Sequence, residues 1–443
     1  MRRSSRPEPE STGRRHESGA TARTACALDR LPHQTHNDRL RAKLEALVAW
    51  KSDYANHYAN QDAIDVLITT NEMNNCHGTG VLIKRVLERP KHLGPRRNLL
   101  CIRFQNDWGD HDLGEWNIRL PKTGGDRVEC FRNILRLLRG RNVRQVLCVP
   151  FQVDELMASI AIQEAFGARL CAYVMDDQNV ATDGIPDAVM REFLENSSLR
   201  LATHPELRRA YERKYGMPFS VLPAVAPDAL IPRSVLPPVL DRGRGALLGS
   251  FWDQSWFDRL CAALESCGRE IDWFGNHRSP FVEFSGEKLG RARIRPFGIV
   301  SEERLAAELR EYPFVIVPTG TLDAAEKNHS VASLSLPGRI PLAAAISQTP
   351  LLIVGGPNTC AARFVRHFGI GENVPYDGTE IRAAMDRLSD ESVQAEVRGN
   401  GARMGRAFSD VGIGDWLEES ITQGRAADGR FEEIFAGYPV ETP

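Results

Sequence analysis

The chain has 443 residues, too many for one ordinary hydrophobic core, so we expect two large domains and a tail. Its 56 Lys and Arg residues nearly balance its 58 Asp and Glu residues, which excludes a global field that would draw it to nucleic acid. The nine cysteines form no CxxC pair and several lie inside apolar runs, which favours reduced, buried thiols over disulfides or a zinc site. No signal-peptide core follows Met1, and no apolar run approaches the roughly 20 residues that span a bilayer, so we predict a cytoplasmic protein.

The first segment, residues 1–37, is rich in Arg, Ser, Glu, Gly and Pro and has no apolar period. We predict either a disordered tail or a stretch upstream of the true start codon. From residue 38 the pattern becomes helical, because Leu40, Leu44 and Leu47 share one face. We expect this helix to pack on the domain that follows, and a membrane-surface helix is the alternative.

The first αβ unit begins with a predicted strand at 65–70, a turn at 71–80 and a helix that starts at 81. A strand, a Gly-containing loop and a helix form the phosphate- or sugar-facing corner of a nucleotide-binding half. The spacing is not GxGxxG, so it is not the dinucleotide fingerprint.

After a strand at 99–104, the loop at 107–112 holds three Asp and one His, for which an exposed polar loop is favoured over a metal site. The helix predicted at 130–139 carries a basic face, which is either a solvated face or a contact for an anionic membrane. Its members are Arg132, Arg136, Arg139, Arg141 and Arg144.

Further strands are predicted at 146–149, 169–174 and 199–203, with helices at 155–166 and 204–215. Asp176 and Asp177 follow the second of these strands, where a carboxylate is well placed to touch a hydroxylated ligand. Adjacent residues of an extended chain point to opposite sides, so we expect at most one of the pair in a site.

The boundaries we predict are a domain at 38–230, a linker at 231–245, a second domain at 246–405 and a C-terminal helical segment at 406–443. The second domain is organised around a βαβ unit, in which apolar runs at 314–317 and 351–354 flank a polar loop and a small-residue helix. Ligands of parallel sheets bind at the carboxyl ends of the strands, so the 319–339 loop is the first candidate site.

Several segments resemble the GT-B glycosyltransferases, above all the retaining group 1 (family 4) kind. They are ATHPELRRAYERKYG, LLGSFW, IDWFGN, FVIVPTGT, SLPGRIPLAAAISQTPLLIVGGPNTCAARFV and FGIG, together with NEMNNCHGTGVLIKRVL in the first half. The resemblance implies an α/β protein with two Rossmann-like doubly wound domains that face each other across a cleft. It also implies a nucleotide-sugar donor on the second domain, an acceptor on the first, and no metal ion or other cofactor.

The resemblance gives the candidate donor residues. Arg339, beside Gly338 at an expected helix start, would supply a cation and backbone N–H groups to the leaving diphosphate. Ser335 offers a hydroxyl near that start or serves only as a cap. The other donor-binding candidates are Gly78, Thr79, Gly80, Gly249, Ser250, Trp252, Gly275, Asn276, Thr319 and Gly320.

One departure concerns the Glu-x7-Glu pair of the retaining families, whose positions fall on Ser335 and Ala343 here. Ribose recognition must therefore use other groups, and Glu326 is the suggested substitute. The candidates for a general base are His77, Asp176 and Asp177. His77 is a candidate because an imidazole titrates near neutral pH, and the two aspartates are the rival candidates. His329 is a weaker candidate on the donor side.

We therefore expect a glycosyltransferase that moves a sugar from a nucleotide-sugar to a glycan, lipid-linked or small hydroxylated acceptor, as in surface polysaccharide synthesis. Peripheral contact with the inner face of a membrane would accompany a lipid-linked acceptor. A nucleotide-sugar epimerase of the same architecture and a non-catalytic binding or scaffold protein are the alternatives, and the missing Glu pair favours the last.

Overall fold

A computed structural model describes residues 63–71, 78–87, 98–104, 113–241, 243–277, 282–323, 326 and 329–439. All of them belong to one compact unit, residues 61–443. The expected tail, the helix after residue 38, His77 and the polar loop at 107–112 lie outside the described residues.

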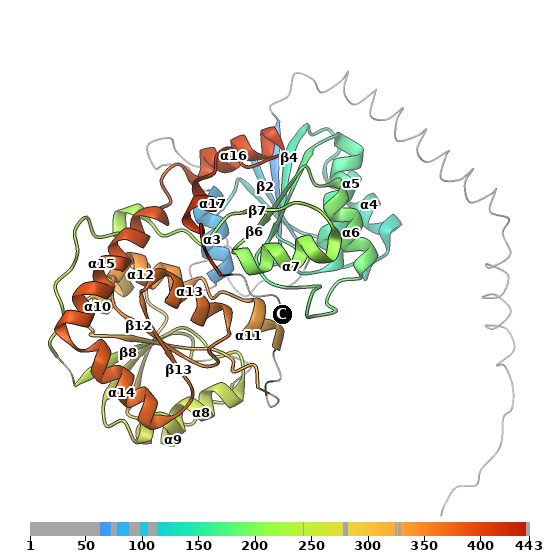
Figure 1. Ribbon diagram of the computed structural model, residues 1–443. Coiled ribbons are helices and arrows are strands. Elements are labelled where there is room, and N and C mark those ends of the chain that lie inside the picture. The colour runs from blue at the N-terminus through green and yellow to red at the C-terminus, as the bar shows by residue number, and fades with distance from the viewer. Residues whose placement is uncertain are drawn as a thin grey trace, which may run out of the picture. The chain divides into compact units, whose positions relative to one another are not determined.

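The first lobe is built on a parallel sheet of seven strands in the order β3-β2-β1-β4-β5-β6-β7 (Figure 1). Its strands are β1 (Ile64–Ile68), β2 (Leu99–Arg103), β3 (Trp116–Arg119), β4 (Val143–Cys148), β5 (Arg169–Val174), β6 (Leu199–Ala202) and β7 (Ser220–Val221). The helices between them are α3 (Gly78–Leu87), α4 (Arg127–Leu137), α5 (Val153–Phe166), α6 (Asp187–Asn196) and α7 (Pro205–Tyr215). The strand order reverses between β1 and β4, which puts the first ligand-binding crevice at their carboxyl ends.

The second lobe is a parallel sheet of six strands in the order β10-β9-β8-β11-β12-β13. Its strands are β8 (Arg244–Leu248), β9 (Glu270–Phe274), β10 (Ile294–Gly298), β11 (Val315–Pro318), β12 (Leu351–Val354) and β13 (Gly371–Val374). Its helices are α8 (Gln254–Glu265), α9 (Gly286–Arg291), α10 (Glu302–Leu309), α11 (His329–Leu334), α12 (Arg339–Ser347), α13 (Cys360–Phe368), α14 (Gly378–Leu388) and α15 (Glu391–Ala407). Here the order reverses between β8 and β11.

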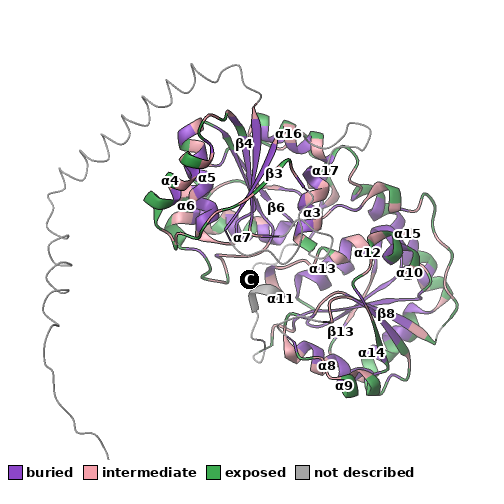
Figure 2. Cartoon of the chain, turned by 180° about the vertical axis from the view of Figure 1, so that it is seen from behind, coloured by how far each residue is buried: buried purple, intermediate pink, exposed green. Residues whose placement is uncertain are grey.

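Helices cover both faces of each sheet, so the central strands are buried throughout and consist of nearly continuous apolar runs (Figure 2). The expectation of two Rossmann-like α/β domains is thus confirmed. Val315, Ile316 and Val317 illustrate the cause, because each is completely buried. Such runs have no polar face to offer to solvent and are stable only between two helical layers.

The chain crosses between the lobes twice, and the two crossings are paired. Ala226 N donates to Phe408 O at 2.8 Å, and Asp410 N donates to Ala226 O at 3.0 Å. After the second crossing, α16 (Ile413–Gln423) returns to the first sheet beside α3, and α17 (Arg430–Ile434) follows (Figure 1). Trp416 and Leu417 of α16 are buried against that sheet, so the C-terminal helices complete the core of the first lobe.

The stretch predicted as a linker is held to the second lobe by two glutamine side chains. Gln348 accepts a hydrogen bond from Leu236 N and donates one to Ser234 O. Gln394 accepts a hydrogen bond from Val239 N and donates one to Val239 O.

Three local expectations were wrong. The helix after β1 begins at Gly78, not at residue 81, so Gly78, Thr79 and Gly80 form its first turn. The sequence pattern of residues 379–403 indicates one helix, whereas the structure has two, because Asp390 accepts from the backbone N–H groups of Ser392 and Val393 and starts a new one. The third is β3, an edge strand that was not predicted and whose four residues alternate between half-buried and exposed.

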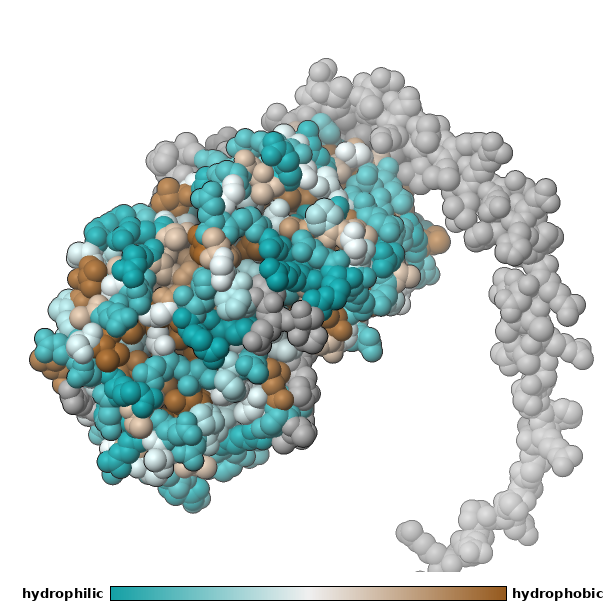
Figure 3. Space-filling view, viewed as in Figure 1, coloured by the Kyte–Doolittle hydropathy of each residue, from teal (hydrophilic) through white to brown (hydrophobic). Residues whose placement is uncertain are grey.

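The predicted basic face is smaller than expected. Arg144 is held by Asp65 and Glu418, and Arg141 stacks on the Trp116 ring. Arg132, Arg136 and Arg139 remain exposed. On the face in Figure 3, hydrophobic residues lie scattered among hydrophilic ones. In the part of the chain that the structure describes, no helix is long and apolar enough to cross a membrane.

Candidate active site

The centre of the candidate site is Arg339, the first residue of α12. Its Nη1 donates to Ser250 O at 3.3 Å and its Nη2 to Pro318 O at 3.4 Å. Ser250 follows β8 and Pro318 ends β11, so the guanidinium bridges the two strands between which the sheet order reverses. Ligands of open α/β sheets bind at that point.

The charge of Arg339 is not neutralised by a neighbour in the described part of the chain. Its only recorded partners there are the two carbonyl oxygens, and its Nε is shielded from solvent without a hydrogen-bond partner. Burial lowers its pKa to about 10, which leaves the group protonated at neutral pH. A half-buried cation without a carboxylate partner is well placed to bind an anion.

Two glycines leave the space that the Arg339 side chain occupies. Gly249 has φ +101°, and a Cβ on it would lie 2.4 Å from the Arg339 guanidinium. A Cβ on Gly275 would lie 2.1 Å from Gly249 O, which also accepts from Trp273 Nε1 at 2.8 Å. Both glycines therefore allow close packing at the ends of β8 and β9, whatever they contribute to a ligand.

The loop after β11 is held in place by hydrogen bonds to side chains beneath it. Glu326 is buried, and its Oε2 accepts from Trp256 Nε1 and from Thr321 N, both at 3.0 Å. The Tyr376 hydroxyl donates to Thr319 O at 2.7 Å. These contacts give Glu326 a structural part in holding the loop, and its suggested role toward a ligand stays a prediction.

Other predicted donor residues lie around the same sheet edge. Trp252 is 49% exposed just after β8, and Asn276 is half-buried just after β9. Thr319 is buried, and a Cβ on Gly320 would lie 2.4 Å from Ala332 Cβ. Gly78, Thr79 and Gly80 belong to the first lobe, and no contact of theirs with these residues is recorded.

The first lobe reaches this site through Asp176. The Ser335 hydroxyl donates to Asp176 Oδ1 at 3.4 Å, so the end of β5 contacts the segment that leads to Arg339. Burial raises the pKa of Asp176, while the hydrogen bond from Ser335 opposes the rise.

The two adjacent aspartates take different parts, as expected for neighbours on an extended chain. The Asp177 carboxylate accepts from the backbone N–H groups of Asn179, Val180 and Ala181 and closes its own turn. Of the pair, Asp176 faces the second lobe.

One group among the described residues has a spacing that would suit a metal ion: His204, Glu206 and Cys360 offer ligand atoms within 4.8 Å of one another. Both His204 nitrogens are already hydrogen-bonded. Glu206 Oε1 accepts from Arg363 Nε at 3.1 Å and from the Tyr438 hydroxyl at 2.8 Å. The guanidinium supplies the positive charge that a metal would supply, so these residues form a polar contact between the lobes.

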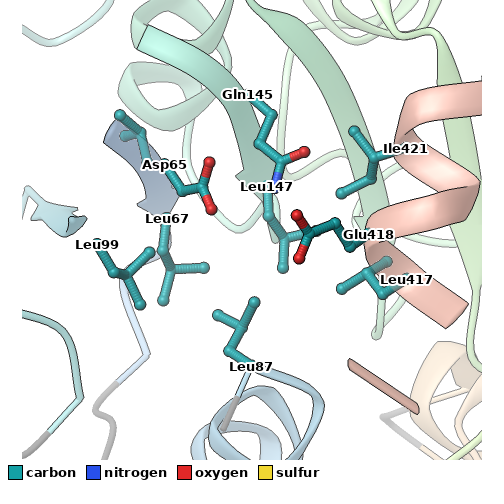
Figure 4. Close-up of a pocket in the computed structure, with 10 residues that line it drawn as sticks. Asp65, Leu67, Leu87, Leu99, Gln145, Leu147, Leu417, Glu418 and Ile421 are labelled. Carbon is teal, nitrogen blue, oxygen red and sulfur yellow. The ribbon is translucent and has the colours of Figure 1, made fainter. Parts of the chain in front are cut away.

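Two hollows lie elsewhere. One of about 10 Å³, between β1, β4 and α16, is lined by Asp65, Gln145 and Glu418 among others (Figure 4). It has room for about one water molecule and suits the unpartnered Oε1 of Gln145. The other, of about 310 Å³, lies between α7 and the end of α11, next to Ser335, and Arg213 and Lys214 line it.

No protein-family model matches the chain, and no curated protein matches it. Solved structures do. The apo form of lipopolysaccharide outer core galactosyltransferase WaaB aligns with a TM-score of 0.56 at 13% identity, over 82% of this chain and 99% of that one. WaaG, a glycosyltransferase involved in lipopolysaccharide biosynthesis, gives 0.54 at 12% identity, over 81% and 100%. A UDP-N-acetylglucosamine 2-epimerase gives 0.51 at 12%, over 86% and 98%.

The fold is GT-B.

Because transferases and an epimerase share this fold, the likeness does not choose between the two activities. In the GT-B frame Arg339 and Ser335 lie on the second lobe and Asp176 on the first. The sequence identified all three residues. It did not identify Tyr376 and His204, whose only trace in the sequence is that each follows the end of a strand.

Proposed function

We propose that this chain is a glycosyltransferase that uses a nucleoside-diphosphate sugar and binds the diphosphate at Arg339. The observation that carries the proposal is the placement of this arginine over the reversal point of the second sheet, with no carboxylate partner among the described residues. It also begins α12, whose positive dipole end favours an anion, although Ile340 N already donates to Pro337 O and Pro341 has no N–H.

The chemistry follows from the charges. Departure of the diphosphate leaves positive charge on the sugar and negative charge on the leaving oxygens. Arg339 and the start of α12 stabilise the negative charge, which is largest in the transition state. The acceptor binds against the first lobe, where Asp176, with its raised pKa, takes the proton of the attacking hydroxyl.

The acceptor is proposed to be a glycan or a lipid-linked sugar. The 310 Å³ hollow beside Leu334, with Arg213 and Lys214 in its lining, offers polar groups to an acceptor, and Lys214 is already paired with Asp187. For a lipid-linked acceptor, the exposed Arg132, Arg136 and Arg139 of the first lobe would contact an anionic membrane. Equal sedimentation of the chain with anionic and neutral vesicles would contradict the membrane contact.

The test is calorimetric titration with UDP, GDP, ADP and dTDP. We expect one base class to bind, and we expect Arg339→Gln to weaken that affinity roughly 10- to 100-fold, because a charge-assisted hydrogen bond is worth about 1.5–3 kcal/mol. Arg310→Gln is the matched control. Arg310 also donates only to carbonyl oxygens, those of Ile346 and Leu230, and burial lowers its pKa too.

The outcomes are distinct. Equal affinities in the two variants would remove Arg339 from the site, and folded protein that binds none of the four nucleotides would contradict the transferase. The epimerase alternative predicts isomerised free donor in place of transfer to an acceptor. Binding without either reaction would support the scaffold.

A further inference from the structure

The start of α7, in the first lobe, contacts the segment of the second lobe that leads to Arg339. His204, the N-cap residue, is 1% exposed, and its Nε2 lies 2.9 Å from Leu334 O. Its Nδ1 lies 2.9 Å from the Thr203 hydroxyl oxygen. Because a carbonyl oxygen only accepts, Nε2 carries the proton. The Thr203 hydroxyl also lies 3.2 Å from Met175 O, so its single proton is shared between that carbonyl and Nδ1 of the neutral ring. Burial lowers the pKa of His204, which agrees with a neutral ring.

A second contact holds the next residue of the same segment. Asp176, at the end of β5, accepts from the Ser335 hydroxyl. Two consecutive residues, Leu334 and Ser335, are thus fixed by the ends of neighbouring strands of the other lobe.

The held segment leads directly into the anion site. Leu334 ends α11, and Arg339 starts α12 after only four intervening residues. One of these is Pro337, whose fixed φ limits how far the segment can rearrange. Ile340 N donates to Pro337 O at 2.9 Å and continues the connection into the helix. A shift at Leu334 O is therefore transmitted to the start of α12.

We propose that His204 is a positioning residue for the nucleotide site: through its hydrogen bond to Leu334 O it fixes the start of α12 and with it the Arg339 guanidinium. This inference rests on the proposed function. It makes the affinity for a nucleoside diphosphate, a ligand of the second lobe, depend on a first-lobe side chain that does not touch it.

The experiment compares His204→Leu with His204→Gln, because the glutamine amide can still donate to Leu334 O and the leucine cannot. By calorimetry with the nucleoside diphosphate that wild type binds, we expect the leucine variant to bind about 10-fold more weakly, as for one lost hydrogen bond. We expect the glutamine variant to stay within about 3-fold of wild type.

Arg85→Gln is the control for general loosening between the lobes. Arg85 of α3 donates to Val225 O and forms an ion pair with Glu302 of the second lobe. This ion pair is another contact between the lobes, and it does not involve the 334–339 segment. We expect this variant to lose thermal stability and to keep its nucleotide affinity.

Each result decides one question. A wild-type chain that binds no nucleotide contradicts the proposed function and says nothing against the contact. If wild type binds, an unchanged affinity in His204→Leu, or an equal loss in the leucine, glutamine and Arg85→Gln variants, overturns the positioning role. If His204→Leu does not fold, Thr203→Val replaces it, since that change removes the hydroxyl beside Nδ1, together with its hydrogen bond to Met175 O, and keeps the size of the side chain. An unchanged affinity in Thr203→Val would then overturn the role.

Discussion

At the scale of single residues, each sheet places an ionisable group where its strand order reverses. In the second lobe this group is Arg339. In the first lobe it is Glu155 on α5, whose Oε2 accepts from Phe151 N and Gln152 N at 2.6 and 2.8 Å, while its Oε1 has no partner. Gln152 Nε2 donates to the Thr70 hydroxyl at 3.0 Å, which joins the loops after β4 and β1. Burial raises the pKa of Glu155 to about 8, against the opposing backbone hydrogen bonds.

Glu155→Gln should change how stability depends on pH. The folded pKa of about 8 lies above the ordinary value of 4.5, so the fold favours the protonated carboxyl. That stabilisation is complete below about pH 4.5 and is lost as the pH rises through about 8. Glutamine resembles the neutral carboxyl and does not ionise. The unfolding temperature of the variant should therefore rise relative to that of wild type between pH 4.5 and pH 8. A constant difference across that range would mean that Glu155 ionises normally.

At the scale of elements, the sequence predicted well where one physical cause dominates. The buried runs of β1, β5 and β11 were found because apolar continuity is a local property. The edge strand β3 was missed because its stability comes from one neighbour and from Arg141 stacked on Trp116, which is a tertiary contact. For the same reason the sequence supplied Arg339 and Asp176 as candidates but not the His204 contact with Leu334.

Loss of α16 and α17 should unfold the first lobe. Ile413, Trp416, Leu417 and Ile421 of α16 are buried against the first sheet. At about 1.5–3 kcal/mol for each buried side chain, their removal costs roughly 6–12 kcal/mol, which is comparable to the whole stability of a domain. We expect a chain that ends at Asp410 to aggregate on expression.

The control for that truncation is Glu418→Gln, also on α16. It breaks the ion pair between Glu418 and Arg144, whose side chains are 33% and 39% exposed, and loss of that pair should cost less than about 1 kcal/mol. Soluble yield and thermal unfolding measure both changes. A truncated chain that is soluble and unfolds at the wild-type temperature would show that α16 is dispensable.

At the scale of the whole molecule, several polar contacts join the lobes, and they come from well-separated stretches of chain. Arg363 of α13 pairs with Glu206 of α7, and the Tyr438 hydroxyl bonds to the same carboxylate. Arg85 pairs with Glu302. None of these pairs could be derived from the sequence, because each joins residues that only the folded chain brings together.

The pairing of Ala226 with Ser409 has a consequence for the origin and the engineering of this chain. The chain leaves the first lobe and returns to it at one place, so the whole second lobe is an insertion at a single position of the first lobe. An exchange of the second lobe between related chains would need two cuts, close together in space but distant in the gene. A recombinant protein with one junction would combine the first lobe of one parent with α16 and α17 of the other. We therefore expect such recombinants to be poorly tolerated.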